Sequence, residues 1–120
     1  MNWPAKYGSY KFVQLEIGSR SLLRFAETDL QPHQFVLRSA LESLSISYDT
    51  QPSSLSGMMI PAPDGERYHV AGMGIGVVFP DEKRVLFDST SKSGDYNLSL
   101  DAEHLDRIRS SVPDWTFQLF

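Results

Sequence analysis

The sequence contains no cysteine among its 120 residues. This absence excludes disulfide frameworks, zinc ribbons, iron–sulfur ligation and thiol catalysis. The chain also lacks any run of the roughly 18 apolar residues that a membrane-spanning helix needs. Its first residues show no apolar stretch of the kind found in secretory signal peptides, and no lipidation motif occurs. We therefore expect a cytoplasmic protein that does not associate with membranes.

Positive charge is also scarce, with 11 Lys and Arg residues against 15 Asp and Glu residues and a net charge of −4 at pH 7. Proteins that bind nucleic acids neutralise phosphates with basic residues, so we expect no nucleic-acid partner. The acidic excess is local, because residues 93–106 contain no Lys or Arg but four acids: Asp95, Asp101, Glu103 and Asp106. Such a patch can steer a basic partner. The alternative is a solvated helix start, where acids stabilise the positive end of the helix dipole.

The length and composition indicate one domain spanning residues 1–120. A mass of 13.5 kDa and 41% hydrophobic residues are enough to close a core without metal or disulfide support.

The N-terminal third predicts a β-hairpin followed by a helix. Residues 10–17 and 20–27 are rich in strand formers and flank Gly18–Ser19, which suits a two-residue type II′ turn. If the numbers of facing residues sum to 37, Phe12 faces Phe25, and neither face of the hairpin is cleanly polar. We therefore expect both faces of the hairpin to be covered.

Pro32 suits the first turn of a helix that runs to about Ser45. Its predicted buried stripe consists of Phe35, Val36, Leu37, Ala40, Leu41 and Leu44. Its predicted outer face consists of Gln34, Arg38, Glu42 and Ser45. Residues 47–57 then lack periodicity and are rich in turn formers, which predicts a mobile loop.

The rest of the chain predicts three strands, a second helix and a final strand. Met58–Ile60 and residues 67–80 form a second hairpin, residues 84–88 add a third strand, and residues 89–95 form a polar loop. Ser99 or Asp101 caps a helix over residues 102–111, with Ala102, Leu105, Ile108 and Val112 directed inward and Glu103 and Arg107 as an outward pair. The alternation of Trp115–Phe120 predicts the last strand.

These elements follow the order β-β-α-β-β-β-α-β. We predict an α+β fold with a mainly antiparallel sheet and both helices on one of its faces. Because two helices connect strands, parallel neighbours and hence a mixed sheet are also consistent with the sequence.

Three alternating glycines, Gly72, Gly74 and Gly76, resemble a phosphate-binding loop only superficially. Their spacing fits neither a dinucleotide-binding fingerprint nor a P-loop, and another strand follows them. On a strand they share one face and leave it flat. That flat strip either receives one of the protein's own elements or serves as a docking surface for a ligand.

No catalytic or metal-binding motif is assembled in the sequence. His33, His69 and His104 show no paired ligand spacing, and no G-x-S-x-G elbow accompanies the serines. We predict no metal site and no cofactor, and we expect His104 to lie at the surface or at a helix cap. Because no such motif is present, we expect a non-catalytic protein rather than an enzyme.

Three functions remain open. The first is a protein-binding module, of the inhibitor or immunity type, that neutralises a basic partner such as a nuclease toxin through Asp95, Asp101, Glu103 and Asp106. The second is a small enzyme or small-molecule binder with a pocket formed by Arg67, Tyr68, His69, Gly72, Gly74 and Gly76. The third is a homo-oligomer that pairs through an edge strand, either Met58–Ile60 or Trp115–Phe120.

Overall fold

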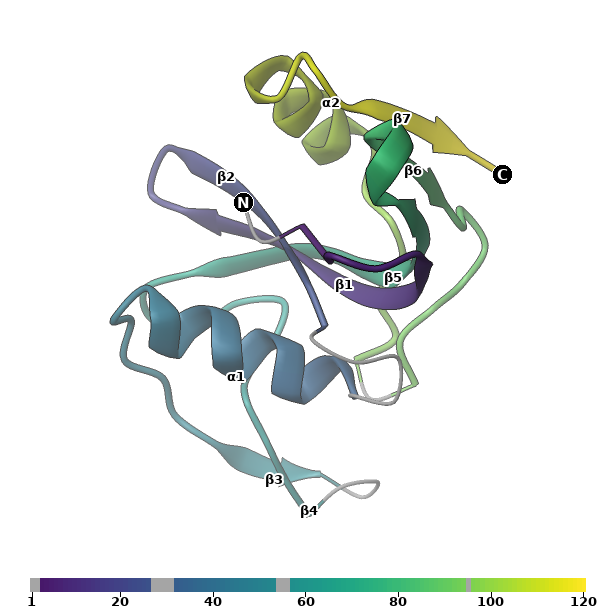
Figure 1. Cartoon of the computed structure of the whole chain (residues 1–120). Coiled ribbons are helices and arrows are strands. Elements are labelled where there is room, and N and C mark those ends of the chain that lie inside the picture. Colours follow the sequence, from purple (N-terminus) through teal and green to yellow (C-terminus); the bar gives the residue numbers. More distant parts are fainter. Residues whose placement is uncertain (1–2, 27–31, 54–56, 95) are drawn as a thin grey trace.

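A curled five-stranded sheet organises the chain in the computed structural model, which describes residues 3–26, 32–53, 57–94 and 96–120 (Figure 1). The elements are β1 (Gly8–Ile17), β2 (Arg20–Phe25), α1 (His33–Ser43), β3 (Gln51–Ser53), β4 (Gly57–Met59), β5 (His69–Phe79), the 3₁₀ turn η1 (Pro80–Glu82), β6 (Arg84–Phe87), α2 (Ala102–Ser111) and β7 (Thr116–Leu119). The predicted α+β class is confirmed. The observed order contains one strand more than the sequence predicted, which is β3.

The strand order in the large sheet is β2-β1-β5-β6-β7. All neighbouring strands are antiparallel except β6 and β7. These two run parallel because the connection through α2 returns the chain to the end of the sheet at which β6 begins. The sheet is therefore mixed.

The first hairpin agrees with the sequence in register as well as in position. Phe12 pairs with Phe25 and Leu15 with Leu22, as the sum of 37 requires. Gly18 has a φ of 61°, which a residue without a Cβ adopts without strain. Both faces of this hairpin are covered.

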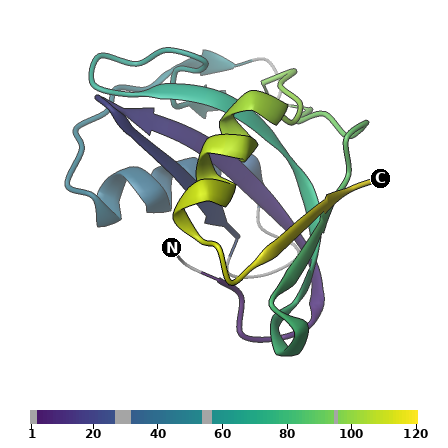
Figure 2. The ribbon, with the colours of Figure 1, turned by 90° about the horizontal axis from the view of Figure 1, so that it is seen from above.

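The two helices lie on opposite faces of the sheet, which corrects the expectation that both lie on one face (Figure 2). One core packs α1 against inward residues of β1 and β5, namely Val13, Leu15, Val70 and Met73. The other packs α2 against the reverse face, namely Phe12, Leu23, Phe25, Val78, Val85, Phe87 and Phe117. The first hairpin explains this arrangement: β1 and β2 carry apolar side chains on both faces, so each face needs a helix to cover it.

Residues 47–57 are not all loop, which corrects a second expectation. Gln51–Ser53 form β3 and pair with β4 in a separate two-stranded sheet, while residues 54–56 lie outside the described part. The predicted hairpin between Met58–Ile60 and β5 is wrong because both edges of β5 are already occupied, one by β1 and the other by β6.

Helix α1 is rotated slightly from its predicted orientation. Gln34 is buried, whereas Phe35 is 38% exposed and lies beneath the guanidinium of Arg38, 5.2 Å from its ring centroid. Pro32 is the N-cap and not a residue of the first turn. Val36, Leu37, Ala40 and Leu41 of the predicted stripe are buried as expected, whereas Leu44 is half-buried and is the C-cap, because the helix ends at Ser43 and not at about Ser45.

Candidate functional site

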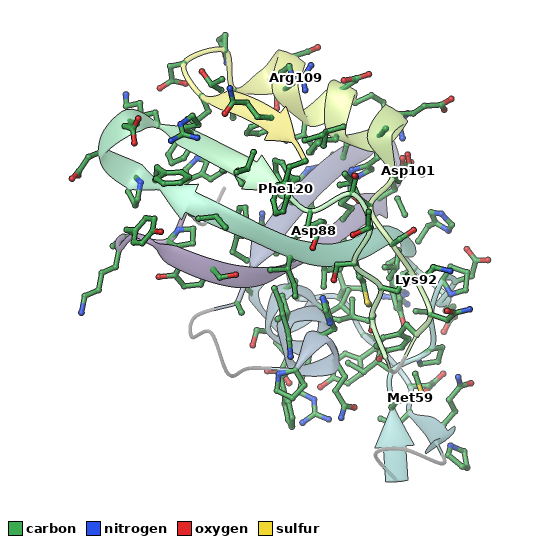
Figure 3. All side chains as sticks on the ribbon, turned by 90° about the vertical axis from the view of Figure 1, so that its right-hand side faces the viewer. Met59, Asp88, Lys92, Asp101, Arg109 and Phe120 are labelled. Atoms are coloured by element: carbon green, nitrogen blue, oxygen red, sulfur yellow. The ribbon has the colours of Figure 1, made fainter. Side chains whose placement is uncertain are left out.

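Of the predicted acidic residues, Asp101 stands at the start of α2, Glu103 lies in its first turn and Asp106 lies further along the helix (Figure 3 labels Asp101). Asp101 is the N-cap, and its Oδ1 accepts a hydrogen bond of 3.0 Å from the backbone N–H of His104. Asp106 pairs with Arg109 at 3.4 Å. Glu103 is exposed, and it has no cationic partner in the described part of the chain. Asp95 lies outside the described residues.

An open hollow of about 570 Å³ lies beside this helix start. It is lined by Ala71 of β5 and by residues 97–103, so that the Asp101 and Glu103 side chains belong to its wall. The structure therefore brings two of the predicted acidic residues to one concave surface. The predicted Glu103–Arg107 pair does not form, because Arg107 instead contacts Glu16 of β1.

His104 is completely buried, which corrects its assignment to the surface or a cap. Its Nε2 lies 2.9 Å from the carbonyl oxygen of Leu15, which can only accept, and its Nδ1 accepts from the amide of Gln14 at 3.2 Å. These partners specify the neutral ring. Burial lowers the pKa of His104, although the Leu15 hydrogen bond and the charges of Glu16 and Asp101 act in the opposite direction.

Gln14 joins β1 to the start of α2. Its amide nitrogen donates to the carbonyl of Asp101 at 2.9 Å, and its Oε1 accepts from the backbone N–H of Asp101 at 2.9 Å. Gln14 and His104 are thus satisfied by one another and by backbone groups. They fix the position of the acidic helix start.

The glycine strip faces the α2 side of the sheet and is filled by the protein itself. A Cβ on Gly72 would lie 2.5 Å from the carbonyl oxygen of Ser99, and one on Gly74 would lie 2.9 Å from the ring of Phe12. A Cβ on Gly76 would meet Val85 at 3.2 Å. These distances support close internal packing, the first of the two interpretations, over an open docking strip.

The predicted small-molecule set does not gather around one pocket. Arg67 is exposed, and Nδ1 of the exposed His69 lies 2.6 Å from Oδ1 of Asp64. Tyr68 is buried in the α1 core, on the opposite side of the sheet from the glycines. A strand directs successive side chains to opposite faces, so neighbouring residues of β5 cannot all line the same cavity.

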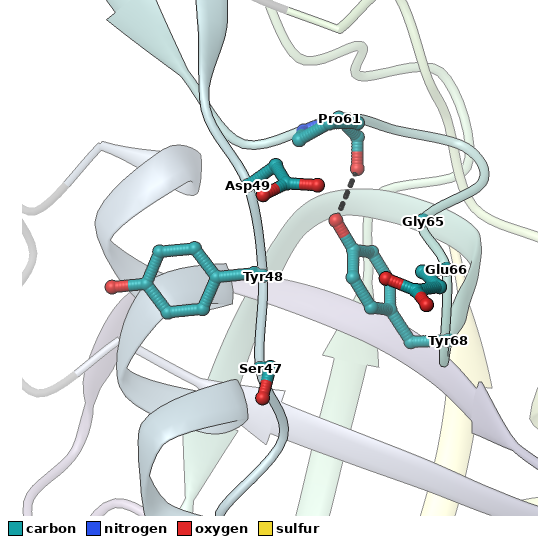
Figure 4. Close-up of a pocket in the computed structure, with 7 residues that line it drawn as sticks. All are labelled: Ser47, Tyr48, Asp49, Pro61, Gly65, Glu66 and Tyr68. Carbon is teal, nitrogen blue, oxygen red and sulfur yellow. Dashed lines mark hydrogen bonds between the residues drawn. The ribbon is translucent and has the colours of Figure 1, made fainter.

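Tyr68 does line a second, smaller hollow of about 60 Å³ (Figure 4). The other lining residues come from the segment after α1, from the segment after β4 and from the turn before β5, and they are Ser47, Tyr48, Asp49, Pro61, Gly65 and Glu66. Of the residues that line this hollow, only Tyr68 belongs to the set predicted from the sequence. The available signal was the irregular segment 47–57, since irregular segments of that length are often functional.

The C-terminal strand is an edge of the large sheet. Leu119 and Phe120 are 48% and 57% exposed, so this edge is accessible to a second copy of the chain. Pairing of two copies through Trp115–Phe120 stays a proposal. Met58–Ile60 instead overlaps β4, which pairs with β3.

The residues that the structure describes contain no cluster of three or more potential metal ligands, and none of their helices has the length and apolarity to cross a membrane.

Comparison with known proteins gave no relative: no protein-family model matches the chain, and no curated protein matches it significantly.

Proposed function

We propose that the protein is a non-catalytic binding domain for a protein with basic side chains, of the inhibitor or immunity type. The observation that carries the proposal is the exposed carboxylate of Glu103, which stands at the wall of a hollow and lacks a cation among the described residues. The network of Gln14 and His104 supports it further, because that network holds the helix start in one position before a partner arrives.

In this proposal the acidic helix start attracts the partner and the hollow receives one of its basic side chains. Complementary charge raises the association rate and makes it sensitive to salt. Asp101 contributes charge while its Oδ1 caps the helix, and Asp106 exchanges its exposed pair with Arg109 for a contact with the partner. Exposed pairs of that kind contribute only about 0–1 kcal/mol, so the exchange costs little.

The test uses immobilised protein and native cell lysate at low salt, followed by elution at high salt. The informative variant is Asp101→Asn with Glu103→Gln, because asparagine caps a helix about as well as aspartate and only the charge is lost. The matched control is Asp81→Asn with Glu82→Gln, which removes two exposed acids from η1.

The proposal is supported if the wild type and the control recover a basic protein in near-equal amount and high salt releases it. The Asp101/Glu103 variant should then fail to recover that protein. Equal recovery by all three proteins, or recovery that salt does not reduce, contradicts the proposed surface. Recovery of no protein contradicts the proposed function in that cell.

Small-molecule binding, with or without catalysis, is the second candidate, because Tyr68 of the predicted set lines the smaller hollow. A thermal-shift screen against metabolites and nucleotides tests it. A ligand at 100 times its dissociation constant stabilises the folded state by about 2.7 kcal/mol. A flat response across the screen contradicts this candidate.

A further inference from the structure

One buried side-chain amide holds the start of α2 against β1. The amide oxygen of Gln14 accepts from the backbone N–H of Asp101 at 2.9 Å, and its nitrogen donates to the carbonyl oxygen of Asp101 at 2.9 Å. The second hydrogen of that nitrogen is directed to Nδ1 of His104 at 3.2 Å. A glutamine amide has only two N–H donors, so both donors of Gln14 are in use.

This arrangement requires a neutral His104 ring. Nε2 lies 2.9 Å from the carbonyl oxygen of Leu15 and therefore carries the ring hydrogen, which leaves Nδ1 as the acceptor. A second proton would turn Nδ1 into a donor that faces the donor nitrogen of Gln14. Two donors form no hydrogen bond with each other, so protonation breaks this contact.

Rotation of the Gln14 amide does not restore the lost contact. A half-turn would bring its oxygen to the protonated Nδ1, but the oxygen would then face the Asp101 carbonyl and the nitrogen would face the Asp101 N–H. One hydrogen bond would form and two would be lost. Without the rotation, the ring of His104 has to move away, and His104 belongs to the first turn of α2.

The surroundings of the ring oppose the additional charge. His104 is fully buried, and this burial is the main reason why its pKa is lowered. The charged groups that face it among the described residues are Glu16 of β1, Asp101 at the cap and Arg107 of α2. The two carboxylates favour the protonated ring, but Glu16 already contacts Arg107, whose charge acts against it. The ring therefore takes up a proton more readily once it has left this position.

The first turn of α2 carries the acidic surface described above. Asp101 and Glu103 belong to the wall of the larger hollow. The segment before them is held to β5 independently, because the backbone N–H of Met73 donates to the carbonyl oxygen of Ser99 at 3.2 Å. That contact involves neither Gln14 nor His104, so we expect the movement to begin at Asp101.

We propose that protonation of His104 detaches the first turn of α2 from β1, so that the surface at Asp101 and Glu103 is held in position at neutral pH and released in acid. The detachment is argued from the hydrogen bonds of Gln14 and His104 and needs no partner. Its consequence, release of a bound partner in acid, rests on the proposed function.

The test is an NMR titration of the wild type from about pH 7.5 to about pH 5. It follows the ring nitrogens of His104, the side-chain amide of Gln14 and the backbone amide of Asp101. We expect all three to change with one midpoint below the ordinary histidine pKa of 6.5. The protection factor of the Asp101 amide against hydrogen exchange should fall about tenfold or more, the effect of losing one buried hydrogen bond, while β5 keeps its protection.

Three variants assign this response to His104. His104→Gln should abolish it, because a glutamine amide offers a donor and an acceptor but takes up no proton in this range. The matched control is His69→Gln, which replaces an exposed histidine bonded to Asp64 and should leave the response unchanged. Gln14→Glu should move the midpoint upward by about one pH unit or more, because a carboxylate accepts from the protonated Nδ1.

The proposal is overturned if the ring stays neutral down to about pH 5. It is also overturned if the ring takes up a proton while the signals of Gln14 and Asp101 stay unchanged. Loss of protection in β5 at the same midpoint would likewise contradict it, because the whole domain would then unfold in place of one helix turn.

Partner release is measured separately. A basic protein captured at neutral pH should leave the wild type at about pH 5 and stay on His104→Gln. Equal release from both proteins contradicts the link between His104 and the partner. Capture of no protein contradicts the proposed function in that cell, whereas the NMR titration still decides whether His104 controls the helix start.

Discussion

At the scale of single residues, Gly72 lies where an added side chain would meet both a buried side chain and backbone atoms. A Cβ there would lie 2.4 Å from Oε1 of Gln14 and 2.5 Å from the backbone oxygen of Ser99. We predict that Gly72→Ala lowers the free energy of unfolding by about 1–3 kcal/mol, the usual cost of overpacking. Urea denaturation followed by circular dichroism measures this change.

The matched control is Gly94→Ala, because a Cβ at Gly94 would meet no atom within 4 Å. Its free energy of unfolding should change by less than about 1 kcal/mol. Equal stability of Gly72→Ala and Gly94→Ala would show that β5 and the start of α2 do not approach as closely as described.

The buried His104 should make the free energy of unfolding depend on pH. Its ordinary pKa is 6.5 and its folded pKa is lower, so the unfolded chain binds the proton more readily. The contribution of His104 is therefore fully present above pH 6.5 and declines as the pH falls below 6.5 toward the folded pKa. The slope for one proton is at most about 1.4 kcal/mol per pH unit.

The test compares the free energy of unfolding of the wild type and of His104→Gln. Urea denaturation measures it at pH 7.5, 6.5 and 5.5, values that span the ordinary pKa of histidine. The variant should be less stable at pH 7.5, since it loses buried hydrogen bonds, and its stability should fall less steeply with acid. Parallel pH profiles for the two proteins would contradict the assignment of a neutral, buried ring.

At the scale of elements, helix α2 depends on its N-cap. We predict that Asp101→Ala lowers the free energy of unfolding by about 1 kcal/mol, because the N–H of His104 loses its acceptor. Asp101→Asn should retain nearly all of the stability, since an amide oxygen can replace the carboxylate. Thermal denaturation of both variants tests this, and equal losses would indicate that charge matters more than capping.

The sequence correctly predicted those elements that are determined by residues close together in the chain. The first hairpin was correct to its register because Gly18 sets a two-residue turn, and the second helix began where Asp101 indicated. The short β3 lacks such a signal: Gln51–Ser53 contain a proline and no alternation, and pairing with β4 defines them as a strand.

Distant contacts account for the burial that the sequence did not predict. His104 is inside because Leu15 and Gln14, about 90 residues earlier in the chain, supply its hydrogen-bond partners. Of the predicted acidic surface, Asp101 and Glu103 meet at one hollow because they belong to one helix start. The smaller hollow combines three separate segments, and no pattern within any one segment announces it.

At the scale of the whole molecule, one sheet separates two cores. The central strands β1 and β5 are bonded on both edges and covered on both faces, whereas β3 and β4 form a two-stranded sheet of their own. We predict that hydrogen-bonded amides in β1 and β5 exchange with solvent most slowly and that those in β3 and β4 exchange fastest, because isolated hairpins are only marginally stable.

Hydrogen exchange followed by NMR measures this order. Protection in β3 and β4 as high as in β5 would mean that the small sheet unfolds only together with the large one. The amides of α1 and α2 provide the internal reference, since each helix packs on one face.

Both tryptophans of the protein lie together, with the rings of Trp3 and Trp115 stacked at 3.9 Å. Both pack against the α2 core, whereas Tyr48, Tyr68 and Tyr96 accompany the α1 core. Tryptophan emission therefore monitors the α2 side of the sheet, whereas tyrosine signals report on both sides, because Tyr10 packs against the α2 core. The α2 core thus carries an intrinsic optical probe of its own, and coincidence of its transition with that of the backbone circular dichroism would establish that the two cores melt as a single cooperative unit.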